Sequence, residues 1–378
     1  MPHSTPLKTI VVTNDFPPRQ GGIQSFVHAM VTRQPAGSIV VYASDYPGAA
    51  EFDAQQPFPV VRHPTGLLVP TPAARGRVVA TAREHGCQAA WFGASAPLGL
   101  LAPALRSAGV TRQIASTHGH EVGWAKLAPG RVALRRIGRD CDVITYLGEY
   151  TRRLLAPAFG PAATLERLTP GVDVDAFHPG IDGSRIRQRY RLTGRPVIVC
   201  VSRLVPRKGQ DALIRALPAI RRAIPGAALL VVGRGKYQRT LSRLAERLGV
   251  GEHVVFTGGV SHADLPAHFA AGDVFAMPCR TRRAGMDVEG LGMVYLEASA
   301  VGLPVLAGDS GGAPDAIQDG VTGYLVDGRD IDAISARLIE LLDDPELRAR
   351  FGAAGRRWVE RDWRWEVVAA RLRGLLDG

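Results

Sequence analysis

The feature that most restricts the fold of this chain is a short apolar run, rich in β-branched residues, that recurs along its length. The first run, at 9–16, stops at a loop that contains proline and glycine, and a helix-like stretch follows it. Runs of the same kind lie at 38–44, 59–64, 89–95, 113–120 and 143–150. Because helix-like stretches separate several of them, the order predicts parallel βαβ units.

A second series of runs follows an irregular segment at 169–180. Its members are 196–203, 227–235, 254–260, 274–280 and 304–312. We therefore expect an α/β fold of two Rossmann-like, doubly wound domains with a hinge near 170–180. Residues 358–378 have the pattern of one terminal amphipathic helix, which periodicity assigns to neither domain. Ligands of open α/β sheets bind at the carboxyl ends of strands, so functional residues should lie just after these runs, around a central cleft.

Composition narrows the class of protein. With 46% apolar and 21% charged residues, the chain is globular in character. Its four widely spaced cysteines form no CxxC pair, so neither a disulfide framework nor a zinc site is expected, and a reducing cytoplasm fits. No apolar run reaches the roughly 18–20 residues that span a bilayer, and no signal peptide is expected at the N-terminus. The net charge of +11 favours anionic partners: phosphate-bearing ligands, an acidic membrane surface or nucleic acid.

Two candidate sites follow strands of the first domain. In NDFPPRQGGIQSF, Gly21 and Gly22 open a helix whose backbone N–H groups can cradle a phosphate, although a plain βα turn is the simpler reading of a GG pair by itself. The loop lacks the spaced GxGxxG of dinucleotide-binding proteins. In STHGHEVGW, His118 and His120 follow a strand, where an imidazole can bind a hydroxyl or a carbonyl. The HxH pattern has no third and fourth ligand beside it, so we predict no metal site.

The second domain supplies a cationic loop, SRLVPRKGQ. Arg203 and Lys208 flank a proline there and can converge on one dianionic group, Arg as a planar fork and Lys as a point charge. Solvated surface cations remain the alternative. Gly233 and Gly235 end the next strand, where the backbone can approach a ligand closely.

Two glutamates mark the segment GMDVEGLGMVYLEASAVGLPVLAG. Glu289 precedes the expected helix start at 290–292, and Glu297 lies about two turns into that helix. Eight helical residues correspond to about 12 Å of rise and roughly 80° of rotation, which is unsuited to an acid and base acting on one bond. One elongated ligand along the helix N-terminus can reach both. A solvated face for Glu297 and a favourable N-terminal position for Glu289 form the simpler reading.

Jointly, these motifs resemble the retaining glycosyltransferases of family 4, which have the GT-B fold. The resemblance covers essentially the whole chain: the GG loop, SRLxxxKG, the GxG turn, E-x7-E and a crossing C-terminal helix. It implies an acceptor-binding domain at 1–173, completed by a helix at about 361–378, and a nucleotide-sugar-binding domain at 174–360. The closer wording of VTNDFPPRQGGIQSF, STHGHEVGW and LVPRKGQDALI is similar to the GDP-mannose-dependent phosphatidylinositol mannoside mannosyltransferases.

The resemblance also implies roles for cationic and glycine residues. Arg203 and Lys208 are expected to hold the nucleotide diphosphate, with the paired glycines of the first loop near it and Gly235 close to the ligand. Members of this fold work without an essential metal, so no cofactor is expected. The chain departs from the family at Arg234, where the family wording has glycine, and this side chain can change contacts at the turn.

The sugar, ribose, base and acceptor have expected partners as well. By resemblance, Glu289 binds the mannose hydroxyls, Glu297 accepts from the ribose hydroxyls, and the Val260 backbone meets the base. His118 is expected near the reacting centre, and Asp15 where the acceptor polyol approaches. His118, Arg203, Lys208 and Glu289 are the residues expected to act in catalysis. Retention is expected by a front-face route, in which the departing phosphate helps to deprotonate the acceptor.

The expected reaction moves mannose from GDP-mannose to the inositol 6-position of phosphatidylinositol monomannoside. Such an enzyme is expected in the cytoplasm, peripheral on the inner face of the plasma membrane. Residues 126–157 carry seven Lys/Arg against three acids, a pattern that suits an anionic leaflet or an ordinary solvated helix face. The alternatives are a family 4 transferase with another donor or acceptor, and a non-catalytic nucleotide- or nucleic-acid-binding protein. No aromatic-interleaved basic patch supports nucleic acid.

Overall fold

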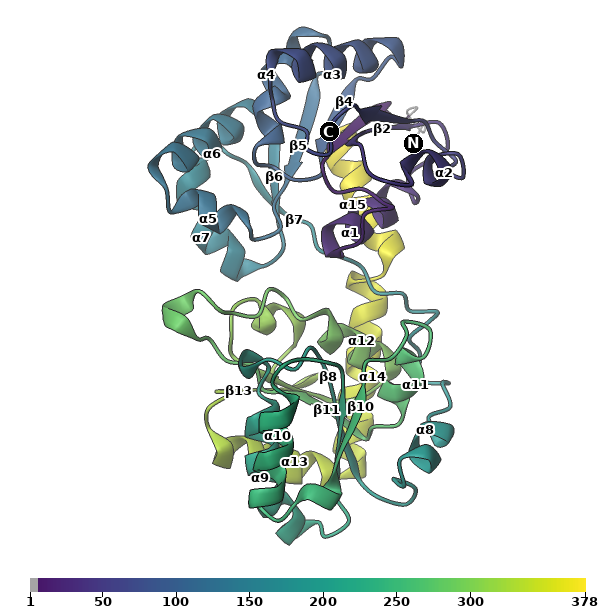
Figure 1. The fold of residues 1–378 in the computed structure, drawn as a ribbon, viewed down its shortest axis with the longest axis vertical. Coiled ribbons are helices and arrows are strands. Elements are labelled where there is room, and N and C mark those ends of the chain that lie inside the picture. The colour runs from purple at the N-terminus through teal and green to yellow at the C-terminus, as the bar shows by residue number, and fades with distance from the viewer. Residues whose placement is uncertain (1–5) are drawn as a thin grey trace. The chain divides into compact units, whose positions relative to one another are not determined.

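The computed structural model describes residues 6–378 and divides the chain into two compact units (Figure 1). Unit 1 runs to Gly171 and is completed by Trp365–Gly378, whereas unit 2 comprises Val172–Arg364. The first crossing lies within the predicted hinge. Each unit is an α/β domain built on a parallel sheet, as the recurring apolar runs predicted.

Unit 1 contains a seven-stranded parallel sheet of order β3-β2-β1-β4-β5-β6-β7. The strands are β1 (Thr9–Thr13), β2 (Ile39–Ser44), β3 (Val60–His63), β4 (Ala89–Phe92), β5 (Arg112–Ser116), β6 (Val143–Tyr146) and β7 (Leu165–Arg167). Each predicted run overlaps one strand, and most of these strands end before the run does. Sequence reasoning missed β7 because its three residues, LER, include no apolar run.

Helices cover both faces of this sheet. They are α1 (Gly22–Val31), α2 (Ala49–Asp53), α3 (Pro72–Glu84), the 3₁₀ turn η1 (Leu98–Leu101), α4 (Ala102–Ser107), α5 (Glu121–Ala125), α6 (Ala128–Asp140), α7 (Glu149–Phe159) and α15 (Trp365–Asp377). Alternation along β1 separates two apolar clusters. Ile10 and Val12 pack in the cluster that includes α3, α4, α6 and α7 side chains. Val11 packs in the other, with α1 and α15.

Unit 2 contains a six-stranded parallel sheet of order β10-β9-β8-β11-β12-β13. Its strands are β8 (Val197–Val201), β9 (Ala228–Val232), β10 (Val254–Gly258), β11 (Val274–Met277), β12 (Val305–Gly308) and β13 (Gly323–Val326). The five predicted runs each contain one strand. The sequence analysis missed β13 because this strand, GYLV, has only four residues and lies between two polar loops.

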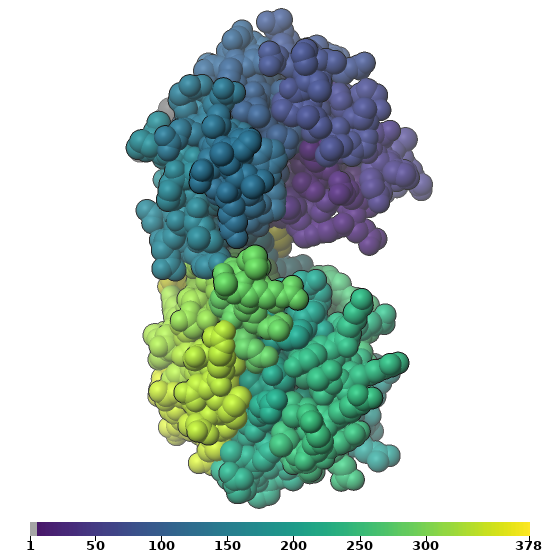
Figure 2. Space-filling model, turned by 60° about the vertical axis from the view of Figure 1, so that its left-hand side comes forward, coloured from purple at the N-terminus to yellow at the C-terminus, as the bar shows by residue number. Residues whose placement is uncertain are grey.

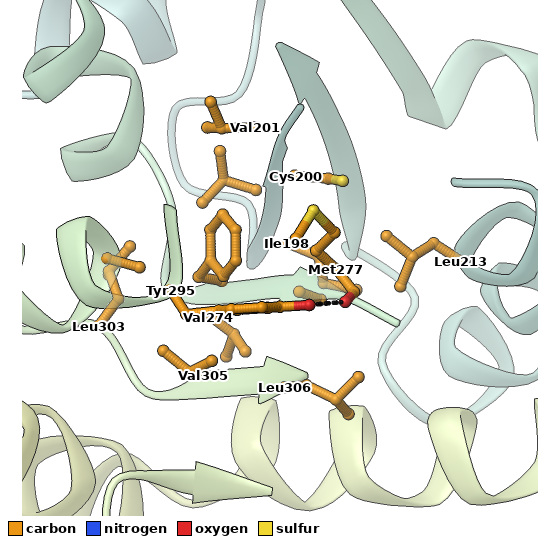
Figure 3. Packing of buried hydrophobic residues seen from close by; sticks show 14 of the residues in the cluster. Ile198, Cys200, Val201, Leu213, Val274, Met277, Tyr295, Leu303, Val305 and Leu306 are labelled. Atoms are coloured by element: carbon orange, nitrogen blue, oxygen red, sulfur yellow. Dashed lines mark hydrogen bonds between the residues drawn. The ribbon is translucent and has the colours of Figure 1, made fainter. Parts of the chain in front are cut away.

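The helices of unit 2 enclose one apolar core. They are α8 (Ser184–Arg189), η2 (Pro206–Lys208), α9 (Gln210–Ala223), α10 (Gln238–Arg247), η3 (Gly251–His253), α11 (Leu265–Ala270), η4 (Arg283–Gly285), α12 (Met293–Val301), η5 (Ala313–Ala316), α13 (Ile331–Asp343) and α14 (Pro345–Asp362). Figure 3 shows Tyr295 of α12 in this core, where its hydroxyl donates to the Met277 carbonyl at 2.7 Å. This bond anchors α12 to β11.

The C-terminal segment is not one helix, which corrects the sequence prediction. α14 ends at Asp362, Trp363 and Arg364 are non-helical, and α15 begins at Trp365. The Trp363 carbonyl accepts from the Val172 N–H at 2.7 Å, so it does not continue the helical ladder. Its buried indole packs edge-on against Trp358, with 5.5 Å between centroids. The break falls where the chain returns to unit 1.

Candidate active site

The first loop of unit 1 leads from β1 into the uncapped start of α1. Gly21 is the N-cap residue, Gly22 is the first helical residue, and both are exposed. Gly21 has no side chain that could cap the amides of the first turn, and the helix dipole adds positive potential there. This helix start, predicted as a phosphate cradle, therefore has the geometry that an anion requires.

Contacts from α1 bring two other predicted residues together in unit 1. Gln24 donates from Nε2 to Asp15 Oδ1 at 2.7 Å. Phe26 lies two residues further along α1, and its ring packs edge-on against the His118 imidazole with 5.3 Å between the ring centroids. Asp15, the α1 start and His118 thus occupy one end of the unit 1 sheet, as the sequence predicted.

The His118 ring is fixed in one orientation. Its Nε2 lies 2.6 Å from the Gly93 carbonyl, which only accepts, so Nε2 carries a proton. Burial lowers the pKa of His118, and the nearby Glu121 carboxylate only partly opposes that effect. The imidazole is therefore neutral near pH 7, with the Nδ1 lone pair available to accept from a ligand hydroxyl.

In unit 2, the two predicted phosphate-binding cations have different surroundings. Arg203 follows β8, is exposed, and its backbone carbonyl accepts from Gln210 Nε2 at 3.0 Å. Within residues 6–378 its guanidinium has no ion-pair partner. Lys208 ends η2 and is only 8% exposed, and its Nζ lies 2.6 Å from Glu289 Oε2. The structure thus joins Lys208 to Glu289, a pairing that the sequence did not reveal.

A second cation adjoins this buried pair. Arg207 Nε lies 3.9 Å from Glu289 Oε2, and Arg207 Nη1 lies 3.6 Å from Asp287 Oδ1. The Arg207 backbone carbonyl also accepts from the Arg280 N–H at 2.8 Å, which holds this loop against the residues after β11. Sequence reasoning missed Arg207 and Asp287. The adjacent cations of VPRKG were the signal that could have found Arg207.

Backbone contacts hold the Glu289 loop in place. The Gly312 N–H donates to the Glu289 carbonyl at 3.0 Å. A Cβ on Gly311, whose φ is +58°, would lie 2.0 Å from that same carbonyl oxygen. Only a loop without side chains can approach so closely, which explains the glycine pair after β12.

Glu297 lies in the second turn of α12 with part of its surface exposed. Its Oε2 is buried and has no hydrogen-bond partner in the described chain, and burial raises the pKa of Glu297 to about 7. α12 begins at Met293 after Gly292, a left-handed N-cap with φ of 82°. Residues 289–292 are not helical, so the expected helical rise from Glu289 to Glu297 is wrong.

The remaining predicted residues lie in neighbouring loops of unit 2. A Cβ on Gly235 would lie 2.1 Å from the Leu204 carbonyl oxygen, so this position needs glycine for packing of the chain itself. Arg234 Nη2 donates to the Gly259 carbonyl at 3.3 Å, directly before Val260. Arg234, where this chain differs from the family wording, therefore contacts the loop that was expected to meet the base.

Unit 2 thus places cations, a glycine-lined loop, the buried Glu289 carboxylate and the partly exposed Glu297 near the carboxyl ends of its strands. Cations and carboxylates in one region suit a ligand that carries both phosphate and hydroxyl groups. Among the residues that the structure describes, no group of three His, Cys, Asp or Glu side chains has the arrangement of a metal site. Within that range, no helix is long and apolar enough to cross a bilayer.

The fold and these strand-end sites define a GT-B glycosyltransferase. A solved structure of HepE from Anabaena, in complex with UDP, superposes with a TM-score of 0.77 at 21% identity, covering 98% of this chain and 99% of that one. The models "Glycosyltransferase Family 4" and "Glycosyl transferases group 1" match residues 20–176 and 183–358.

Sequence comparison assigns the chain to a narrower family of glycosyltransferases. It is 56% identical over 374 residues to the "GDP-mannose-dependent alpha-(1-6)-phosphatidylinositol monomannoside mannosyltransferase" of Mycolicibacterium smegmatis, with 98% of both chains covered. A Corynebacterium glutamicum protein, named as the corresponding enzyme for the monoacylated acceptor, is 49% identical over 98% of both chains. The chain therefore belongs to this family of glycosyltransferases, as its motifs had suggested.

Proposed function

We propose that this protein transfers mannose from GDP-mannose to the inositol 6-position of phosphatidylinositol monomannoside, with retention at the anomeric carbon. The named relatives support the donor and acceptor. The observation that carries the chemistry is the buried Lys208–Glu289 pair at 2.6 Å, and the exposed Arg203 lies earlier in the same loop, between β8 and η2. A nucleoside diphosphate sugar offers a phosphate to the cations and hydroxyl groups to the carboxylate.

In this proposal, donor binding exchanges the partners of the pair. The diphosphate takes Lys208 and Arg203, and the mannose hydroxyls then donate to the Glu289 carboxylate, which retains Arg207 nearby at 3.9 Å. Each buried charge keeps a partner in both states, which avoids the cost of an isolated buried ion. Glu297 accepts from the ribose, and the Val260 backbone reads the base.

The chemical step breaks the bond between the mannose C1 and the diphosphate oxygen and forms a bond from C1 to the inositol oxygen. The proton of the acceptor hydroxyl passes to the departing phosphate on the same face. We propose that cations and helix N–H groups stabilise the leaving diphosphate without a metal. Loss of one such preorganised donor typically raises the barrier by about 2.7–4 kcal/mol.

The acceptor is a lipid, and we propose that the α6–α7 region of unit 1 contacts the anionic membrane surface. Leu127, Val132 and Leu154 are exposed by 65%, 54% and 41%. Exposed cations lie among them along the same segment: Lys126, Arg131, Arg135, Arg136 and Arg153. Apolar side chains among cations suit the headgroup region of an anionic leaflet. Figure 2 shows this blue-teal part of unit 1.

The test combines the protein with GDP-mannose and phosphatidylinositol monomannoside in vesicles, with and without EDTA, and measures GDP release. We expect GDP only when both substrates are present, equal rates with EDTA, and a new α-(1-6) linkage by NMR of the product. Release only with another nucleotide sugar or a soluble acceptor would reject the donor or the lipid assignment. A rate abolished by EDTA would reject metal independence.

A variant separates membrane contact from turnover. Arg131→Glu combined with Arg135→Glu should lower partition onto vesicles that contain phosphatidylinositol, since each cation near such a surface contributes about 1 kcal/mol. Arg75→Glu combined with Arg83→Glu provides a control of equal charge change at exposed positions of α3. Equal partition of both double variants would reject the α6–α7 surface. The net charge of +11 is then assigned to phosphate ligands and lipid, and we propose no nucleic-acid partner.

A further inference from the structure

Glu121 is a carboxylate with no exposure at all, although it lies at the first residue of the short helix α5. Sequence reasoning assigned it nothing. A buried carboxylate needs donors around it, because leaving it unpaired costs several kcal/mol. The arrangement of those donors shows what this side chain holds.

Two of the donors are backbone amides of the loop after β5. Glu121 Oε2 accepts from the N–H groups of His118 and Gly119, each at 3.0 Å. Gly119 has a φ of +93°, and the two hydrogen bonds to Glu121 stabilise this left-handed conformation. The carboxylate therefore fixes the backbone that carries the His118 ring.

The other oxygen of Glu121 reaches the neighbouring loop, after β4. Ser95 Oγ donates to Glu121 Oε1 at 3.2 Å, and His120 Nε2 lies 3.4 Å from the same oxygen. The His118 ring bonds to the Gly93 carbonyl of that same loop. The β4 and β5 loops are thus joined twice, once through the imidazole and once through the carboxylate, and these two contacts determine where the imidazole stands.

We propose that Glu121 is a positioning residue for His118, which joins the two loops so that the imidazole meets the transferred sugar in one orientation. This inference rests on the proposed function in one respect, namely that the His118 imidazole contacts the transferred sugar. A displacement of about 1 Å at a reacting centre can cost about 10²-fold in rate, so a residue that fixes this loop controls turnover without touching substrate.

Three substitutions at Glu121 test this role. Glu121→Gln keeps an oxygen for the two amides and an amide group for Ser95 Oγ, so we expect kcat within about three-fold of wild type. Glu121→Ala removes both contacts, and Glu121→Asp keeps the charge but withdraws it by one methylene. For these two we expect kcat lowered by about 10²-fold and about 10-fold, with the affinity for GDP unchanged. Glu84→Ala, at an exposed position of α3, serves as the control.

The outcomes separate this inference from the proposed function. Wild-type turnover with GDP-mannose tests the function, whereas the ranking Gln above Asp above Ala, measured well below each melting temperature, tests positioning. In parallel, ¹⁵N-histidine NMR reads the His118 ring without any turnover. We expect the neutral Nε2–H form in wild type and Glu121→Gln and a changed signal in the other two. Wild-type kcat in Glu121→Asp, or an unchanged His118 signal in Glu121→Ala, would overturn the proposal.

Discussion

The strand-end regions of the two units differ in how well their polar groups are satisfied. In unit 1, Asp15 accepts from Gln24, His118 bonds to Gly93 and Glu121 has three hydrogen bonds. In unit 2, Glu297 has a buried oxygen without a hydrogen-bond partner among residues 6–378, and Lys208 and Glu289 are held together at low exposure. Unit 1 is therefore organised before a ligand arrives, whereas unit 2 has polar groups that a ligand with phosphate and hydroxyl groups would satisfy.

The largest expected effect comes from removing the buried cation of unit 2. Lys208→Ala should lower kcat by about 10²–10³-fold, because the leaving diphosphate loses a preorganised donor. The same change leaves Glu289 beside Arg207 alone, so the melting temperature should also fall. Adding Glu289→Gln should restore the melting temperature but not kcat, as measured by calorimetry and GDP release. Lys236→Ala, an exposed cation in the loop before α10, is the control, and a wild-type rate in Lys208→Ala would refute the phosphate role.

Stability should reveal the unsatisfied carboxylate at Glu297. Its pKa of about 7 in the folded protein exceeds the ordinary value of 4.5, so the folded state binds the proton more tightly and loses stability as pH rises from 4.5 through 7. Glu297→Gln should raise the free energy of unfolding at pH 8 by at most about 3 kcal/mol and change it little at pH 4.5. Urea unfolding at the two pH values measures this, and an equal gain at both would contradict it.

Donor affinity should follow the same titration. The ionised Glu297 accepts from ribose hydroxyls better than the protonated form, so the KM for GDP-mannose should fall as pH rises through about 7. Glu297→Ala should raise that KM by about 10-fold, the value of one hydrogen bond to a charged group. The pH dependence should disappear in Glu297→Gln. A KM that stays unchanged in Glu297→Ala would refute ribose contact.

The smallest effect tests the organised site of unit 1. A Cβ on Gly21 would lie 2.2 Å from Gln24 Oε1, whereas a Cβ on Gly22 meets no atom within 4 Å. Gly21→Ala should therefore displace Gln24 from Asp15 and lower turnover several-fold, by about 1 kcal/mol. Gly22→Ala is the matched variant and should leave the melting temperature unchanged. Equal kinetics for the two would show that the Gln24 contact plays no part.

The sequence predicted most strands because a buried parallel strand has a local signature. It missed β7 and β13, which are short and mixed in composition. The sequence indicated the individual site residues because they follow strand ends, but it did not indicate which of them form pairs. Whether Lys208 meets Glu289 depends on how closely the glycines after β12 approach the backbone of another loop, and nothing local encodes that distance. The sequence did not indicate a role for Glu121 either, because an acid in the first turn of a helix is explained by the helix dipole alone.

The return of the chain to unit 1 has a consequence for its biosynthesis. Val368, Leu372 and Leu376 of α15 pack in the same apolar cluster as Val11 and Phe26 of the first strand and helix. Helix α1 covers part of that side of the first sheet, but the area under α15 stays uncovered while the ribosome adds residues 172–364, an entire second domain. The nascent chain thus exposes this apolar surface for about half of its translation. A chain that ended at residue 364 would carry a complete second domain attached to a first domain that cellular chaperones and proteases recognise as incomplete.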